Sequence, residues 1–287
     1  MKQIIITLCF LVYAMVLAAQ DDLLASLEEE QADETTWVDA TFKGTRLING
    51  HSIETRKKGV MDFMISHRFG TIDGGTYELF GLDQASIRIG LEYAVSDRLY
   101  FGIGRSSFEK TYDSFVKYRL FRQSKGKRNF PLSVTWLSSV ALKTLKNPDL
   151  ELSFQDKLAF TNQLLIARKF DNGISLQLMP TWVHRNLIQE EDLNNDVLAL
   201  GVGGRIKISQ RVALCAEYYY QFQDLNERTT NAIAIGFDIE TGGHVFQLQF
   251  TNATSMVPKG FITETTNDFF DGEIHFGFNI SRTFQVN

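Results

Sequence analysis

Beyond its first twenty residues, the sequence lacks both a second cysteine and any long apolar run. Cys9 lies within the apolar stretch Ile4–Leu17, so the rest of the chain contains only Cys215 and no intrachain disulfide can form there. No later run approaches the ~18 apolar residues that a membrane helix requires. Without disulfides or membrane helices, the chain must rely on a large core or a closed sheet, and 287 residues are enough for either.

Patterns typical of nucleic-acid, metal and phosphate sites are also missing. No basic stripe is concentrated enough to indicate nucleic-acid binding. The five histidines are scattered and no Cys-rich cluster accompanies them, so we predict no metal site and no cofactor. The glycines of the run 201–204 lie inside a strand pattern without a following helix. This excludes a phosphate-binding loop and favours close packing or a β-bulge.

The first twenty residues have the three parts of a secretory signal peptide. Lys2 supplies the positive charge, Ile4–Leu17 forms the apolar core, and small residues at 18–19 precede the cleavage site. An apolar core of about 14 residues is too short to cross a bilayer. We therefore predict that residues 1–20 are cleaved and that the chain is exported.

Residues 21–59 are predicted to form an N-terminal periplasmic arm. Its first part, Asp21–Glu34, carries seven acidic groups and no basic ones, whereas the rest of the exported chain is close to neutral. Charge runs of this kind are usually solvated, which favours a flexible tether or a tail that docks a partner protein. The alternative is a plug, in which the arm folds back with Thr41–Asn49 and blocks a basic lumen by charge attraction.

From Val60 onward the dominant hydrophobic period is two, which indicates β-strands. In Ser86–Tyr93, for example, apolar residues alternate with polar residues or glycine. About twelve such segments follow one another, near 60–69, 85–94, 99–107, 111–122, 130–143, 156–170, 174–187, 196–208, 212–222, 230–240, 244–252 and 272–284. No helical period of comparable length is present in this part of the sequence.

The connections between these segments alternate in length. Short turns are expected at 95–98, 171–173, 209–211 and 241–243, and longer loops at 70–85, 147–155, 188–195, 224–229 and 253–272. This alternation is typical of outer-membrane barrels, which have short periplasmic turns, longer external loops and an even strand number. The sequence therefore predicts an all-β fold. It is an antiparallel, up-and-down transmembrane β-barrel of about twelve strands over residues 60–287, in contact with outer-membrane lipid.

A periplasmic all-β protein is the alternative, because its strands would alternate in the same way. Segments of about ten residues exceed the usual globular strand of about five or six, and they match a tilted strand that crosses a bilayer. Aromatic residues also gather near segment ends, as Phe69, Tyr93 and Phe250 do, where they would lie at the two membrane interfaces. Both features favour the outer membrane.

Four short runs carry a resemblance to a known family. They are Thr41–Thr55, His67–Gly70, Val116–Leu120 and Ser281–Phe284. With these runs the chain resembles an uncharacterised family of outer-membrane β-barrels, a domain of unknown function in Gram-negative bacteria. The resemblance covers nearly the whole exported chain and implies a fold and a location. It brings no known substrate and no catalytic residue.

The polar faces of the predicted strands would line the barrel interior. The candidate lumen-lining residues are Arg68, Arg88, Glu92, Lys117, Arg119, Lys169, Arg185, Arg205, Lys207 and Glu217. Most of them are basic, so one hypothesis is a passive channel or binding site for a small solute, with an anion favoured. The alternative is a filled lumen in which acidic and basic side chains pair. Such a barrel would anchor periplasmic or surface proteins through its arm and the loop Ala253–Gly272.

An outer-membrane hydrolase is the third alternative. A serine nucleophile and a histidine base would have to meet in space. His67 follows Ser66 directly, and neighbouring residues on a strand point to opposite faces. The spacing of His184 and Ser175 does not assemble a site either. We therefore predict no enzyme.

Overall fold

The computed structural model describes residues 34–146, 148, 151–170, 173–187, 194–223 and 229–286, and the chain divides into two compact units. The described part of the smaller unit is 34–39 and 122–131, where β1 (Thr35–Trp37) pairs antiparallel with β6 (Ser124–Gly126). β6 lies between the predicted segments 111–122 and 130–143, where no strand was predicted. The larger unit begins at Ala40 and contains a closed β-barrel. The predicted signal peptide and the acidic run up to Asp33 lie outside the described residues.

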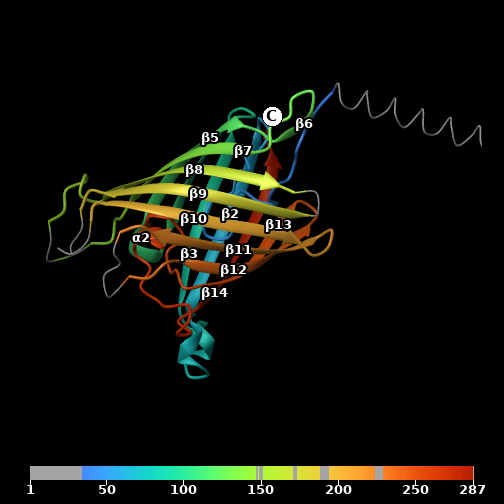
Figure 1. Ribbon diagram of the computed structural model, residues 1–287. Helices are drawn as coiled ribbons and strands as arrows, with labels where there is room; N and C mark the ends of the chain where they lie inside the picture. Colours follow the sequence, from blue (N-terminus) through green and yellow to red (C-terminus); the bar gives the residue numbers. More distant parts are fainter. Residues whose placement is uncertain are drawn as a thin grey trace, which may run out of the picture. The chain divides into compact units, whose positions relative to one another are not determined.

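Within the described residues, twelve antiparallel strands form the barrel (Figure 1). They are β2 (Val60–Thr71), β3 (Ala85–Ala94), β4 (Leu99–Ser106), β5 (Tyr112–Phe121), β7 (Ser133–Leu142), β8 (Leu158–Lys169), β9 (Ile174–Arg185), β10 (Asp196–Lys207), β11 (Val212–Gln221), β12 (Ile233–Thr241), β13 (His244–Thr251) and β14 (His275–Gln285). Each strand pairs with the barrel strands before and after it in the chain, and β14 pairs with β2 to close the sheet. The predicted antiparallel barrel of about twelve strands is confirmed.

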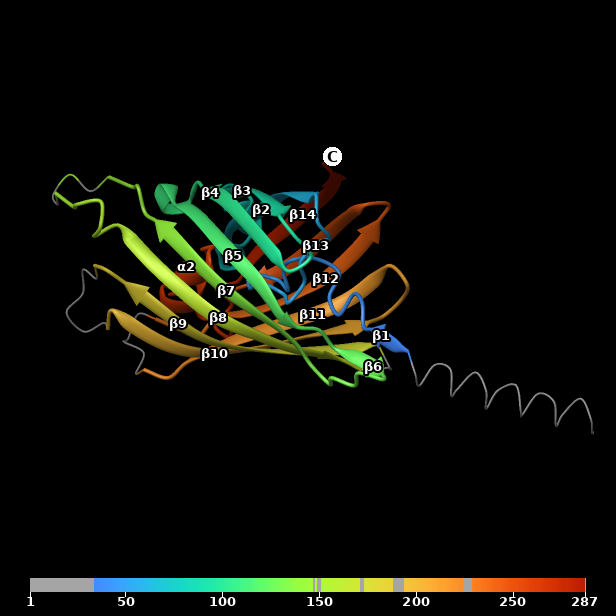
Figure 2. The same cartoon turned by 90° about the horizontal axis from the view of Figure 1, so that it is seen from above.

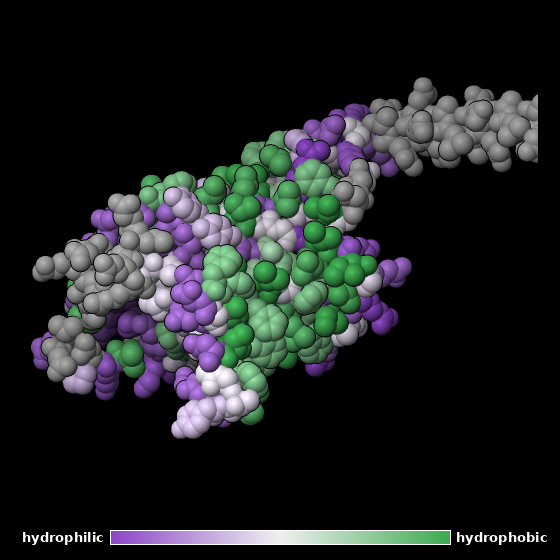
Figure 3. Space-filling view, turned by 60° about the horizontal axis from the view of Figure 1, so that its bottom comes forward, coloured by the Kyte–Doolittle hydropathy of each residue, from purple (hydrophilic) through white to green (hydrophobic). Residues whose placement is uncertain are grey.

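The two faces of each strand differ as the alternating sequence requires. On β3, Ile89 and Leu91 are 47% and 43% exposed on the outside, whereas Arg88 and Glu92 are buried inside. Figure 3 shows hydrophobic side chains gathered over the middle of one face of the molecule, with hydrophilic ones towards its ends. An outer face that is apolar along most strands is suited to contact with hydrocarbon. The closed sheet meets the second requirement of that environment, because it leaves no strand edge with unpaired backbone groups.

The two ends of the barrel carry different connections. At the short-turn end, 95–98 joins β3 to β4, 208–211 joins β10 to β11, and 242–243 joins β12 to β13. At the long-loop end, 72–84 contains the 3-10 helices η1 (Ile72–Gly74) and η2 (Leu79–Gly81), 107–111 contains η3 (Phe108–Lys110), and 252–274 contains the short helix α2 (Pro258–Thr263). Over the described part of the chain, no helix is both long and apolar enough to cross a bilayer.

Two segments run inside the barrel. Residues 40–59 precede β2 and join the wall at the short-turn end, where the Gly59 N–H donates to the Ala94 carbonyl. Figure 2 shows this segment (blue) between strands on opposite sides of the barrel. Residues 252–267 form the first part of the connection from β13 to β14, and most of them are buried. Residues 40–59 thus fold with the barrel unit, and Thr41–Asn49 lie where the plug alternative of the sequence analysis placed them.

Candidate functional site in the barrel lumen

The lumen contains a buried hairpin formed by residues 41–55, here called the inner hairpin. The Leu47 N–H donates to the Gly50 carbonyl at 2.8 Å, and the Ser52 N–H donates to the Thr45 carbonyl at 3.1 Å, so the chain reverses at 47–50. Most residues between Thr41 and Thr55 are buried. Because only a few bonds close the hairpin itself, most of its backbone groups need partners on the barrel wall.

Glu217 of β11 binds the tip of the inner hairpin. Its carboxylate accepts hydrogen bonds from the backbone N–H groups of Asn49 at 2.7 Å, Gly50 at 3.2 Å and Ile48 at 3.3 Å. Glu217 is 3% exposed. A buried carboxylate is tolerated only when its oxygens are hydrogen-bonded, and three backbone donors meet that need.

Lys117 of β5 binds the two legs of the same hairpin. Its ammonium donates to the backbone carbonyls of Thr45 at 2.9 Å, Ser52 at 2.9 Å and Glu54 at 3.2 Å. Lys117 is fully buried, and an ammonium has three donors to satisfy. The hairpin thus gives three carbonyls to a wall cation and three N–H groups to a wall carboxylate.

Neutral side chains on other strands complete the attachment. Gln177 of β9 accepts from the Ile53 N–H and donates to the His51 carbonyl, both at 2.8 Å. Further bonds to the hairpin are donated by Gln247 of β13 to Leu47, by Asn279 of β14 to Ile48, and by Thr135 of β7 to Ile53. Together with β5 and β11, strands around the whole barrel hold the hairpin.

An ionic cluster lies beside the hairpin near β2–β4. Arg46 of the hairpin pairs with Glu92 of β3 at 2.7 Å, and both side chains are buried. The Tyr100 hydroxyl lies 2.8 Å from Glu92 and 2.7 Å from Asp62. Arg56 pairs with Asp62 at 2.7 Å. The two carboxylates are therefore balanced by arginines that the segment 40–59 supplies.

Glycines on the lumen side make room for the hairpin. A Cβ at Gly50 would lie 2.1 Å from the Tyr219 hydroxyl, so the tip can pass Tyr219 only without a side chain. A Cβ at Gly203 of β10 would lie 2.1 Å from Cδ2 of Leu47. One at Gly201 would lie 2.5 Å from the Tyr219 ring. The glycine run 201–204 therefore serves close packing, one of the two explanations that the sequence left open.

A second segment fills the lumen from the long-loop end, residues 253–265, here called the inner loop. All six residues of α2 are buried. Lys259 lies 2.6 Å from Glu264 and 3.5 Å from Glu109 of η3, and Glu109 also pairs with Lys143. Burial raises the pKa of Glu109, but the charges of Lys259 and Lys143 outweigh burial and hold that pKa below its usual range. These ion pairs tie the inner loop to the barrel rim.

Tyr219 of β11 lies between the two buried segments. Its ring packs against Phe261 of the inner loop with centroids 5.1 Å apart, and its hydroxyl faces Gly50 of the hairpin. Leu47, Phe261 and Ile262 belong to one buried apolar cluster. The hairpin and the loop thus meet in the middle of the lumen and fill it from both ends.

A small cavity remains where the hairpin faces β2 and β3. Its volume is about 10 Å³, about the space that one water molecule occupies. Arg46, Arg68 and Arg88 line it, with Asn49 among the polar groups. Arg88 pairs with Asp113 at 2.5 Å, and Arg68 donates to the Asn49 side chain. The cavity is too small for an organic solute.

The sequence candidates occupy different parts of this site. Arg68, Arg88, Glu92, Lys117, Arg185, Arg205 and Glu217 are buried. Arg119 is half-buried and donates to Thr55 of the hairpin. Lys169 is half-buried and Lys207 is exposed, and both lie where their strands end at the short-turn end. The structure brings Arg68, Glu92, Lys117, Arg119 and Glu217 together on the segment 40–59.

The neutral side chains that hold the hairpin were not among the lumen residues predicted from the sequence. Gln177, Gln247 and Asn279 lie on polar strand faces. The alternating pattern therefore predicts that they face the lumen, although the candidate residues included only ionic groups. A chain segment inside a barrel presents backbone N–H and C=O groups in equal numbers, and side-chain amides match both. Amides on the inner face were therefore the signal for a buried segment.

The described residues contain neither a cluster suited to a metal ion nor an accessible thiol. No group of three or more His, Cys, Asp or Glu side chains there is arranged to hold a metal ion. Cys215 is buried on β11 and donates to Asp238 at 3.3 Å. A thiol closed off in this way fills space, as buried cysteines usually do.

One family model matches most of the chain. The family described as "Membrane bound beta barrel domain (DUF5777)" matches residues 42–284. No curated protein matches the chain. Among solved structures, the chain is similar to the NanC porin (TM-score 0.47, 8% identity, covering 79% of this chain and 100% of that one). It is also similar to the KdgM porin (TM-score 0.45, 9% identity, covering 78% of this chain and 99% of that one). A third similar structure is an outer membrane channel from Pseudomonas putida F1 (TM-score 0.46, 11% identity, covering 80% of this chain and 97% of that one).

Proposed function

The chain belongs to the DUF5777 family of membrane-bound β-barrel domains, and on this premise we propose that it is an outer-membrane barrel held closed by its own chain. In this proposal the barrel serves as a structural or docking component. The short-turn end faces the periplasm and the long loops face outward, as in other outer-membrane barrels. The acidic run Asp21–Glu34 is the proposed docking segment for a periplasmic protein, and no catalytic role is proposed.

One observation carries the proposal: strands on all sides of the barrel bind the backbone of the inner hairpin. Glu217, Lys117 and Gln177 alone account for eight hydrogen-bonded hairpin groups. A hydrogen bond to a charged group contributes about 1.5–3 kcal/mol and a neutral one about 0.5–1.5 kcal/mol. Removing the hairpin would break all of them at once and leave both charges without these partners. A hairpin held in this way supports a permanently closed lumen.

Passage of small anions after release of the hairpin is the second candidate. The buried wall residues do not favour it, because Arg68, Arg88, Lys117, Arg185 and Arg205 are nearly balanced by Asp62, Glu92, Glu217 and Asp238. The observation in its favour is the position of Arg119, Lys169 and Lys207, which lie at the short-turn end. Cations at that mouth would attract anions to an opened barrel.

Single-channel conductance in a planar bilayer separates the two candidates. The full exported chain should give no stable conductance steps, because the hairpin and the inner loop block the lumen. A variant lacking both residues 21–55 and the inner loop, residues 253–265, should conduct, because either segment alone blocks one end of the lumen. Reversal potential across a KCl gradient then measures whether the opened barrel prefers anions.

A second deletion serves as the matched control. Removal of residues 21–39 takes away the acidic run but leaves the inner hairpin, and this variant should stay silent. Heat-modifiable migration and a β-rich circular dichroism spectrum establish that each variant is folded. Stable steps from the full chain would overturn the closed barrel and favour a passive channel.

A further inference from the structure

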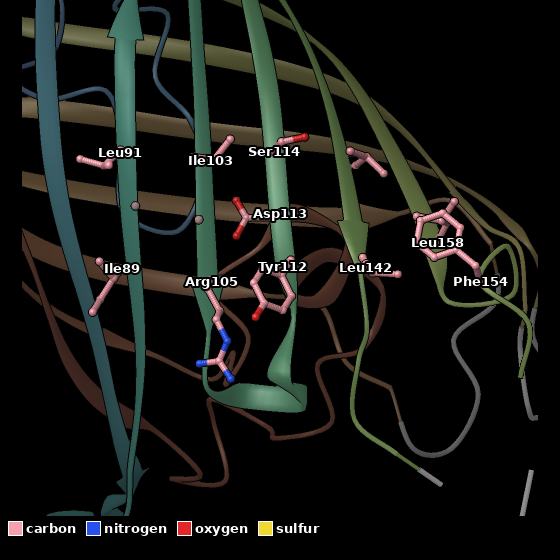
Figure 4. A pocket seen from close by; sticks show the side chains of 13 residues that line it. Ile89, Leu91, Ile103, Arg105, Tyr112, Asp113, Ser114, Leu142, Phe154 and Leu158 are labelled. Carbon is pink, nitrogen blue, oxygen red and sulfur yellow. The ribbon is translucent and has the colours of Figure 1, made fainter.

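A groove lies on the outer face of β3, β4, β5 and β7, away from the lumen. Its volume is about 820 Å³, within the range of about 300–1,000 Å³ that small-molecule sites occupy. Its walls are mostly apolar, with Leu91 and Ile103 on one side and Leu142, Phe154 and Leu158 on the other. Figure 4 shows these side chains along neighbouring strands. A hollow of this composition is suited to a hydrocarbon chain.

Ser114 explains why the barrel is hollowed here. It faces outward on β5 and pairs across the sheet with Ile103 of β4 and Val140 of β7. The other outward residues of β5 include Tyr112 and Val116, which are larger and exposed. A serine between branched neighbours leaves a depression in a surface that is otherwise continuous.

The groove ends at a single exposed cation. Arg105 is the outward residue of β4 nearest the long-loop end, and its guanidinium lies 5.4 Å from the centre of the Tyr112 ring. Figure 4 shows the two side chains together, close to η3. Among the described residues, no carboxylate forms an ion pair with Arg105, and the Asp113 carboxylate, which also lines the groove, is paired with Arg88. The exposed guanidinium can therefore bind an anionic group of a ligand.

We propose that this groove binds one acyl chain of a phosphate-bearing membrane lipid, with the phosphate at Arg105. The guanidinium fork matches phosphate oxygens in geometry and charge. The distance along β4 from Ile103 to Arg105 is two residues, so a lipid whose chain lies on Ile103 brings its headgroup to the arginine. The proposal concerns the outer face alone and does not depend on whether the lumen is closed.

Native mass spectrometry of the full exported chain in non-ionic detergent tests the proposal. The probes are dimyristoyl phosphatidic acid and dimyristoyl glycerol, which have the same chains and differ in the phosphate. We expect one phosphatidic acid per barrel, bound about tenfold more tightly than the glycerol. Arg105→Gln should bind both lipids equally. Ser114→Phe fills the groove and should bind neither.

Arg168→Gln is the matched control. Arg168 lies 5.1 Å from the Phe170 ring at the short-turn end of β8, the same arginine–aromatic arrangement without the groove. Its lipid binding should equal that of the unchanged protein, and heat-modifiable migration verifies that every variant is folded. Equal phosphatidic acid binding by Ser114→Phe, or an unchanged phosphate preference in Arg105→Gln, would overturn the proposal. So would a dimer without bound lipid, which would make the groove an interface between copies.

Discussion

Two buried charges in the lumen are stabilised by backbone rather than by each other. The Glu217 carboxylate accepts three hairpin N–H groups, and the Lys117 ammonium donates to three hairpin carbonyls. A buried charge needs this number of hydrogen bonds to offset the loss of water. The hairpin therefore takes the place of solvent around both groups, and they in turn fix its position.

Removing the Glu217 carboxylate should loosen the tip of the inner hairpin. In Glu217→Ala, the N–H groups of Ile48, Asn49 and Gly50 lose their acceptor. Each buried donor left unpaired costs about 1–3 kcal/mol. We expect trypsin to cleave after Arg46, which is 9% exposed in the intact protein. Mass spectrometry of the fragments over time measures the rate of cleavage after Arg46.

Glu240→Ala is the comparison for that experiment. Glu240 of β12 also contacts the segment 40–59, through Lys43, but its side chain is 42% exposed. An exposed ion pair contributes about 0–1 kcal/mol, so cleavage after Arg46 should change little. If both variants were cleaved at the same rate, buried hydrogen bonding would not be what holds the hairpin.

At the level of single elements, β10 has adjacent glycines on its two faces, one towards the filled lumen and one towards the outside of the barrel. Gly203 faces the lumen, where a Cβ would lie 2.1 Å from Leu47. Gly204 faces outward, where a Cβ would lie 3.0 Å from Cδ2 of Leu176, the far end of a flexible side chain, and 3.3 Å from the Ser175 carbonyl oxygen. Adjacent glycines in one strand are therefore expected to respond differently to the same substitution.

Gly203→Val should displace the inner hairpin, whereas Gly204→Val should not. Overpacking of a filled interior costs about 1–3 kcal/mol, and here the added methyl groups meet the buried Leu47. The measurement is the temperature at which the folded band converts to the unfolded band on electrophoresis, together with trypsin cleavage after Arg46. Gly203→Val should lower that temperature and expose Arg46. Equal behaviour of the two variants would mean that Leu47 has room to move.

The strands could be predicted from sequence because each one carries its own signal. Period-two alternation shows the two faces of a strand without knowledge of its neighbours, and every barrel strand begins and ends within three residues of the predicted segment. The inner hairpin has no such local signal. Asn49 and its acceptor Glu217 are 168 residues apart, and nothing near either residue specifies the other.

The candidate site was therefore predictable only in part. Parity on the strands selected Lys117 and Glu217 as lumen residues, and the plug alternative placed Thr41–Asn49 in the lumen. The sequence did not predict which backbone groups of that segment the two side chains bind. The six residues of α2 are too few to show a helical period, so their burial in the lumen was not predicted. The short sheet of β1 and β6 was missed for the same reason, since three residues cannot establish alternation.

At the scale of the whole molecule, closure of the sheet and filling of the lumen depend on different sets of contacts. Closure depends on β14, which pairs with β13 on one side and with β2 on the other, from Val60↔Gln285 to Thr71↔His275. The inner hairpin takes no part in that ladder. Its bonds run from side chains of the wall to its backbone, so the ring of strands is complete without it.

Deletion of β14 and deletion of the inner hairpin should therefore have different consequences. Ending the chain at Gly272 leaves β2 and β13 as open edges, and each unpaired backbone group in hydrocarbon costs several kcal/mol. We expect this variant to give no heat-modifiable band in lipid vesicles. The variant lacking residues 21–55 should retain one, at a lower conversion temperature, because the ladder is intact while Glu217 and Lys117 have lost their partners. Loss of the folded band in both variants would mean that the barrel closes around the hairpin and requires it, and filling would then be a condition of closure.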